Sequence, residues 1–146
     1  MSTITFFTDK KPACVGVGTN MFMAENIIDF SRKKALAGDV VQCLNIPKGA
    51  YVLNVMVTVL TAEGATCTAT VGDADGANSW DASTNLNATA GTVTAGVSGT
   101  DAYALTGKTY TSDDTIDLTM GHDADTAKIS VCTCYGIIEA LANSEV

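Results

Sequence analysis

The stretch "VVQCLNIPKGAYVLNVMVTVL", Val40 to Leu60, decides the predicted fold. Its first part, Val40–Ile46, alternates loosely between apolar and polar residues, and Tyr51–Leu60 is a longer run rich in β-branched residues. Both patterns indicate β-strands. Between them Pro47 restricts φ and Gly49 permits the left-handed region, which is the chemistry of a tight turn. We therefore predict a β-hairpin over Val40–Leu60.

Further strand patterns follow this stretch. Alternating or β-branched runs cover Ala65–Gly72, Asp114–Met120 and Ala127–Ile138, and glycine-containing turns separate them. Many short strands joined by such turns are typical of sandwiches and barrels. Only Ser31–Gly38, which starts with serine and ends with glycine, could form a helical turn, and a loop is the alternative. We predict an all-β fold, an antiparallel β-sandwich or jelly-roll-like domain.

The N-terminal segment differs from the rest of the chain. Residues 1–26 contain apolar groups interrupted by glycines, and the first good strand pattern comes after them. The segment could be an arm that packs on a neighbouring copy or an edge segment of its own domain. We therefore divide the chain into residues 1–26 and a β-sandwich domain of residues 27–146. The N-terminal segment offers three candidates for contact with a partner, which are Phe6, Phe7 and Phe22.

The composition limits the class of protein. The chain has 146 residues, of which 47% are hydrophobic and 16% charged, and this length suits one domain with a sizeable core. Its net charge of -8 argues against nucleic-acid binding, which needs basic groups to displace counterions from phosphates. No stretch has the length of a membrane span, and the N-terminus lacks a signal-peptide pattern. We expect a protein that is made in a cytoplasm and binds neither nucleic acid nor membrane.

Basic residues are unevenly distributed along the chain. Arg32, Lys33 and Lys34 form the only run of three basic residues, and no basic residue occurs between Lys48 and Lys108. A basic run of this kind could meet an acidic surface on a partner, although a solvated surface is the simpler interpretation. Arg32 to Lys34 are therefore a second candidate contact region.

The five cysteines form no recognisable disulfide or metal-binding pattern. Their number is odd, and the C-x-C pair near the C-terminus differs from the C-x-x-C of many metal and redox sites. A zinc site would need two further ligands, and the chain has a single histidine, His122. We predict free cysteines that fill a β core. They are Cys14, Cys43, Cys67, Cys132 and Cys134.

The stretch "VGDADGANSWDAST", Val71–Thr84, concentrates acidic and amide side chains. An EF-hand register that starts at Asp73 fails at its fifth position, which is Ala77. A looser calcium loop is an alternative, but aspartate, asparagine and glycine are also the residues that turns require. We predict a long connection that closes off a core strand. The calcium candidates are Asp73, Asp75, Asn78 and Asp81.

The same stretch contains the only tryptophan, Trp80. It could be a ligand platform, as in carbohydrate-binding proteins, or an anchor at a protein interface, where tryptophan is enriched. It could also fold under the loop of its own domain. We count Trp80 among the candidate interface residues.

Catalysis has little support in the sequence. A nucleophile or a general base needs a partner within hydrogen-bond reach, and the single histidine lies in a predicted turn. The "GVG" of Gly16 to Gly18 lacks the third glycine and the strand–helix context of a nucleotide loop. We expect neither an enzyme nor a cofactor.

An ordered series of strand and turn phrases resembles a known family. The phrases are "GDVVQCLNIPKGAYVLNVMVTVLTAEG" (Gly38–Gly64), "VGDADGANSWDA" (Val71–Ala82), "NATAGT" (Asn87–Thr92) and "KTYTSDDTIDLTM" (Lys108–Met120). Over roughly Ile27 to Glu139 the chain resembles small head decoration, or cement, proteins of tailed bacteriophages. No catalytic signature takes part in this resemblance.

The resemblance implies a virion structural protein. Its fold would be β-rich, its assembly a homotrimer, and its place the outer surface of an icosahedral capsid assembled in the host cytoplasm. Its partners would be the major capsid protein and further copies of itself. The alternative is a carbohydrate- or calcium-binding β module on a phage head or tail fibre.

Overall fold

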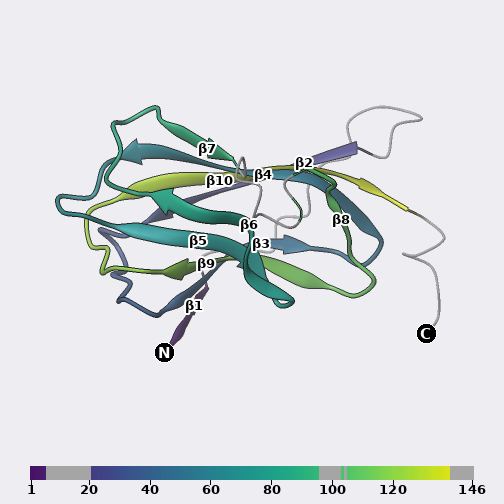
Figure 1. The fold of residues 1–146 in the computed structure, drawn as a ribbon, viewed down its shortest axis with the longest axis horizontal. Helices are drawn as coiled ribbons and strands as arrows, with labels where there is room; N and C mark the ends of the chain where they lie inside the picture. The colour runs from purple at the N-terminus through teal and green to yellow at the C-terminus, as the bar shows by residue number, and fades with distance from the viewer. Residues whose placement is uncertain (6–20, 96–102, 104, 139–146) are drawn as a thin grey trace.

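The computed structural model describes residues 1–5, 21–95, 103 and 105–138. Within these residues the chain is all-β, and its strands form two sheets that pack face to face, which confirms the predicted β-sandwich (Figure 1). The strands are β1 (Thr3–Thr5), β2 (Met21–Asp29), β3 (Val40–Ile46), β4 (Ala50–Thr61), β5 (Thr68–Asp73), β6 (Gly76–Asn85), β7 (Val93–Ala95), β8 (Lys108–Thr109), β9 (Asp114–Met120) and β10 (Lys128–Ile137).

Each sheet is named here by its central strand. The β9 sheet has the order β1-β3-β9-β5-β6, and the β10 sheet has the order β2-β10-β4-β7, with β8 also paired to β4. Strands β1 and β3 run parallel, and the other pairs are antiparallel. Most neighbours in a sheet are therefore distant in sequence.

The predicted hairpin over Val40–Leu60 is wrong. Strand β3 pairs with β1 and β9, whereas β4 pairs with β10, β7 and β8, so the two strands lie in opposite layers. Their turn has the predicted chemistry: Gly49 has φ +84°, and its N–H donates to the carbonyl of Tyr110. Both strands carry a row of apolar side chains, and placing the strands in opposite sheets lets these rows face each other across the core.

The core lies between the two sheets. Alternate side chains of β9 and β10 point into it, and the clean alternation of Asp114–Met120 predicts this for β9. Cys43 and Cys67 are buried, as expected of small core residues, whereas Cys132 and Cys134 on β10 are only half-buried. All four are free, and Cys14 lies outside the described residues. The inward residues of β9 and β10 are Ile116, Leu118, Met120, Ile129, Val131, Thr133 and Tyr135.

The N-terminal division predicted at residues 26 and 27 falls inside a strand. Strand β2 starts at Met21 and pairs with β10 from Met21 to Asp29. Residues 21–26 are therefore part of this strand of the β10 sheet. Phe22 points inward and stacks on Tyr135, with 5.5 Å between ring centroids. Phe6 and Phe7 lie outside the described residues.

The segment Ser31–Gly38 is a loop of turns, not a helical turn. Ala35 forms an isolated bridge with Ala124, and the backbone of Gly38, at φ +87°, donates to Met120. These contacts with the β9–β10 connection take the backbone groups that a helix would use. No helix in the described part of the chain is long and apolar enough to cross a membrane.

A buried carboxylate, that of Glu63, links the loop after β4 to the loop before β10. Glu63 follows β4 and accepts hydrogen bonds from the backbone N–H groups of Asp125, Thr126 and Ala127, and from the Thr126 hydroxyl. Burial by itself raises the pKa of Glu63, but these hydrogen bonds to the charged form outweigh it and lower the pKa to about 2. The ionised side chain thus ties the end of β4 to the start of β10.

Candidate functional site

The stretch Val71–Thr84 forms a β-hairpin of β5 and β6, and the predicted long connection is wrong. The strands meet at a tight turn in which the Asp73 carboxylate accepts a hydrogen bond from the N–H of Asp75. Gly72 is required there because a Cβ would collide with the backbone of Gly76 and Ala77. The sequence of β6 is polar because β6 lies at the edge of its sheet, where solvent reaches it, and for this reason it resembles a loop.

Trp80 points from β6 into the core and is fully buried. Its Nε1 donates to the hydroxyl oxygen of Tyr110 at 3.2 Å, and its ring lies 5.4 Å from that of Tyr103, centroid to centroid. Of the three roles considered for Trp80, the structure matches the one in which it packs in its own domain. Its ring is therefore not exposed as a platform for a glycan or an anchor for a partner.

Lys108 occupies the space between the two acidic residues of the hairpin turn. Its Nζ lies 2.7 Å from Oδ2 of Asp73 and 2.7 Å from Oδ2 of Asp75. It also lies 4.5 Å from the ring centroid of Tyr110 and 4.9 Å from that of Tyr103. Burial lowers the pKa of Lys108, but the two carboxylates outweigh this and raise it, so the ammonium stays charged.

The calcium candidates are not gathered around one point. Asp73 and Asp75 are bound to Lys108, so a lysine ammonium occupies the position that their charges would offer to a cation. Asp81 accepts hydrogen bonds from Ser83 and Thr84, and Asn78 is exposed on β6. The described residues contain no group of three or more His, Cys, Asp or Glu side chains that could hold a metal ion.

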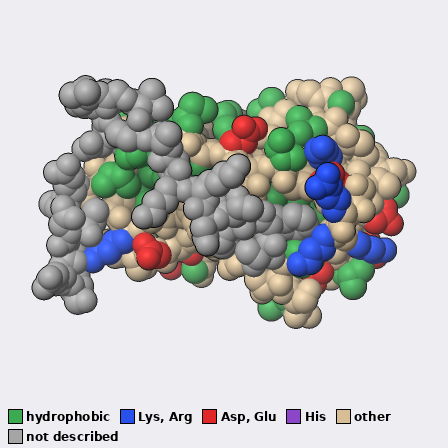
Figure 2. All heavy atoms as spheres, turned by 180° about the vertical axis from the view of Figure 1, so that it is seen from behind, with side chains coloured by type: hydrophobic (Ala, Val, Ile, Leu, Met, Phe, Trp, Pro, Cys, Tyr) green, Lys and Arg blue, Asp and Glu red, His purple; other side chains and the backbone are tan. Residues whose placement is uncertain are grey.

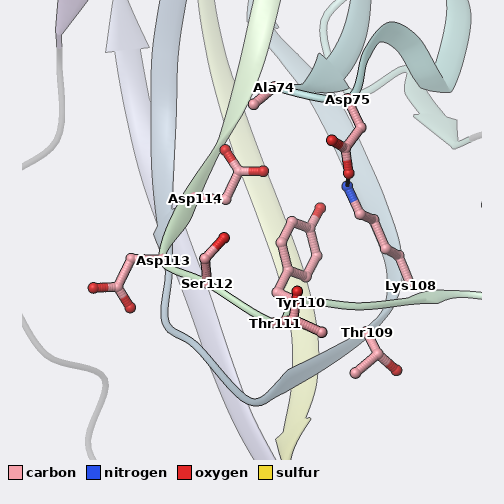
Figure 3. Close-up of a pocket in the computed structure, with 9 residues that line it drawn as sticks. All are labelled: Ala74, Asp75, Lys108, Thr109, Tyr110, Thr111, Ser112, Asp113 and Asp114. Carbon is pink, nitrogen blue, oxygen red and sulfur yellow. Dashed lines mark hydrogen bonds and ion pairs between the residues drawn. The ribbon is translucent and has the colours of Figure 1, made fainter. Parts of the chain in front are cut away.

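A shallow pocket of about 200 Å³ opens beside Lys108 (Figure 3). Figure 3 shows Asp75 reaching towards Lys108, whereas Asp113 points away from the pocket. Burial and the hydrogen bond to Asp73 raise the pKa of Tyr110, which keeps its hydroxyl protonated. The lining therefore presents the Lys108 ammonium together with carboxylates and hydroxyls. It consists of Ala74, Asp75, Lys108, Thr109, Tyr110, Thr111, Ser112, Asp113 and Asp114.

The outer surfaces of the two sheets differ in polarity. Outward positions of the β9 sheet are polar, as at Thr70, Asp117 and Thr119. The β10 sheet instead presents large apolar side chains and the two half-buried cysteines of β10 between few charges. Figure 2 shows such hydrophobic side chains along the upper part of the molecule in that view. The exposed ones on β2, β4 and β7 are Met21, Met23, Ile27, Leu53, Met56, Leu60 and Val93.

Basic side chains gather towards one end of the sandwich, as Figure 2 shows. Nε of Arg32 lies 3.6 Å from Oδ2 of Asp29. Nζ of Lys34 lies 3.6 Å from Oδ2 of Asp123 and 3.8 Å from Oδ2 of Asp125. Lys33 lies between Arg32 and Lys34 in the chain. These ion pairs are exposed, so each contributes little to stability and can be exchanged for contacts with a partner.

The fold is similar to that of chains in bacteriophage capsids. A chain of the acid-stable capsid of Helicobacter pylori bacteriophage KHP30 matches 83% of this chain and 90% of its own length, with a TM-score of 0.60. A chain of the cyanophage Pam1 capsid asymmetric unit matches 89% and 95%, with a TM-score of 0.61. A chain of the capsid of Ralstonia phage GP4 matches 93% and 98%, with a TM-score of 0.58.

The sequence itself shows little of this similarity. Identity to each of the three capsid chains is 18%, so the likeness concerns the fold. No protein-family model matches the chain. No curated protein matches it in sequence.

Proposed function

We propose that this chain is a structural protein of a phage virion that decorates and stabilises the capsid shell. In this proposal it binds the major capsid protein on the outer surface of the shell and associates with its own copies as a homotrimer. The observation that carries the proposal is the likeness of fold to chains of three phage capsids, over 83% to 93% of this chain.

Two features of the molecule are compatible with this role. The β10 sheet carries exposed apolar side chains on its outer surface, and larger apolar patches on a soluble domain mark sites of association. Free cysteines suit a protein that is assembled in a reducing host cytoplasm.

A decoration protein would act by mass action. If it binds the assembled shell and not the separated subunits, it stabilises the shell by an amount that rises with the ratio of its free concentration to Kd. Such a role needs shape complementarity and an apolar contact, and it needs no reacting group. The carbohydrate- or calcium-binding alternative has less support, because Trp80 is buried and Lys108 holds Asp73 and Asp75.

The proposal is tested with capsids of the encoding phage that were assembled without this protein. The purified chain is mixed with these capsids and sedimented, and its stoichiometry on the shell is measured. We expect saturable binding at a fixed number of copies per capsid and a higher melting temperature of the shell. A chain that remains in the supernatant at every concentration would overturn the proposal.

A further inference from the structure

In the described part of the chain, strand β2 is a long edge strand of the β10 sheet. Among the described residues it pairs with β10 alone, through nine consecutive residues from Met21 to Asp29 and without a bulge. The other edges differ: β1 and β7 have three residues each, and β6 is polar and pairs with β5 through two register shifts. In the described part of the chain β2 is therefore the long, regular and apolar edge.

Strand β2 itself lacks several of the devices that proteins use to block unwanted pairing. Such devices are proline, lysine, bulges and very short strands, and the sequence "MFMAENIID" of β2 contains no proline, lysine or arginine. Of its two acidic residues, Glu25 accepts a hydrogen bond from the Ser130 hydroxyl, and Asp29 lies at the end of the strand beside Arg32 and Lys128. The backbone groups of β2 that pair with no described residue are thus available to an added strand.

The outward side chains of β2 are apolar and exposed. Met21 is 41% exposed, Met23 70% and Ile27 50%. They continue into the outer surface of the sheet, because Met23 lies opposite Cys134 on β10, and Cys132 in turn lies opposite Met56 on β4. Methionine side chains are flexible and adapt to the shape of a partner. A strand added to β2 would lie beside this row and extend the apolar surface.

We propose that β2 is a docking edge that takes up an extended, apolar strand from another protein subunit of the capsid shell. The main-chain groups of that strand would continue the hydrogen-bond ladder of the β10 sheet, and its alternate side chains would lie against Met21, Met23 and Ile27. This inference rests on the proposed function and names the surface through which the chain meets the shell.

The size and charge of the contact favour a shell subunit over a second copy in solution. A nine-residue edge is about 30 Å long and about 10 Å wide with its side chains, which is roughly 300 Å² against about 800 Å² per partner in a stable complex. Two copies paired along β2 would also bring the acidic residues Glu25 and Asp29 of both strands onto one ladder, where like charges repel. A contact of this size is useful in a repeated lattice, where many weak contacts act together.

The test compares two double variants on the same capsids. Met23→Lys/Ile27→Lys places two charges on the outward row of β2, and Asn78→Lys/Ser83→Lys adds the same charge to exposed positions of β6, the edge of the other sheet. Unchanged melting temperatures verify that both variants fold. We expect the β2 variant to bind capsids at least tenfold more weakly than wild type, and the β6 variant to bind within twofold of it.

Hydrogen–deuterium exchange gives a second, independent readout. Capsid binding should slow exchange of β2 amides that exchange rapidly in the free chain. Equal binding of both variants, or β2 amides already protected in the free chain, would overturn the inference while the proposed function stands. A stable oligomer of the free chain that only the β2 variant disrupts would show that a second copy occupies the edge, and would also overturn it. Wild-type chain that fails to bind capsids would overturn the proposed function itself.

Discussion

The Nζ atom of Lys108 lies 2.7 Å from Oδ2 of Asp73, whose side chain is completely buried. Tyr110 donates its hydroxyl hydrogen to the same carboxylate oxygen at 2.7 Å, and Trp80 donates to the Tyr110 oxygen. A buried charge requires partners of this kind, because removal from water is otherwise costly. The chain of contacts from Lys108 to Trp80 therefore links the β5–β6 turn to the core.

Replacement of Lys108 by methionine should destabilise the protein. The substitution keeps much of the side-chain volume but leaves the buried Asp73 carboxylate without its cation, which costs about 3 kcal/mol. Urea unfolding measures the loss, and Lys34→Met is the control because its ion pairs with Asp123 and Asp125 are exposed and contribute less than about 1 kcal/mol. The double variant Asp73→Asn/Lys108→Met should recover part of the lost stability. Equal effects of the two single substitutions would contradict this account.

Tyr110→Phe tests the next contact in the chain. The variant keeps the ring that lies beside the Lys108 ammonium but removes the hydroxyl that bonds Asp73 and Trp80. The loss of a hydrogen bond to a charged group costs about 1.5–3 kcal/mol, and Trp80 loses its acceptor as well. We expect a lower urea midpoint together with a changed tryptophan fluorescence in the folded state. Tyr51→Phe, whose hydroxyl donates to the exposed carbonyl of Thr106, should change the midpoint less.

The sequence predicts the class of fold but not the pairing of its strands. Alternation shows which side chains of a strand share a face, and the inward residues of β9 follow it, whereas both faces of β10 are mixed in sequence. Nothing in the alternation of Val40–Leu60 shows that β3 and β4 lie in opposite sheets, because their partners β9 and β10 are more than fifty residues away. Strand β6 is also not predictable from the sequence, because its polar residues match those of a loop.

The candidate site was only partly predictable. Trp80 and the two aspartates of the turn stand out in the sequence, yet their partners Lys108 and Tyr110 are distant in the chain. The apolar row of β2 carries a sequence signal, since Met21, Met23 and Ile27 are separated by two and four residues and so share one face of a strand. Phe22 is the most conspicuous apolar residue of that segment, but it belongs to the opposite, inward row.

Glu63 should make the protein sensitive to acid. Its pKa is about 2 in the folded state and 4.5 as the ordinary value, so its contribution to stability is complete above about pH 4.5 and is lost as the pH falls towards 2. Glu63→Gln should cost about 1.5–3 kcal/mol at pH 7, because the backbone donors lose a charged acceptor. It should also flatten the pH dependence of the urea midpoint between pH 4.5 and 2. A variant with the wild-type slope in this range would contradict the assignment.

Asp117 should have the opposite effect to Glu63 on the pH dependence of stability, because its ionisation at higher pH destabilises the folded protein. It lies on the outer side of β9, and its Oδ1 is buried without a hydrogen-bond partner among the described residues. Burial, with smaller effects of Asp114 and Asp73, raises its pKa to about 6 against an ordinary value of 3.8, although a hydrogen bond with Thr115 lowers it. The folded state thus holds this proton more tightly than the unfolded state, and the protein loses stability as the pH rises from about 3.8 to 6.

Asp117→Asn should therefore stabilise the protein at neutral pH. The amide is similar in shape to the carboxylate and carries no charge, so the cost of ionising a poorly solvated group disappears. We expect a gain of about 1 kcal/mol at pH 7.5, discounted for the partial exposure of the side chain, and almost none at pH 3.5, where the aspartate is largely protonated. Urea unfolding at the two pH values measures the difference. A variant less stable than wild type at pH 7.5 would show that the carboxylate has a partner that the structure does not contain.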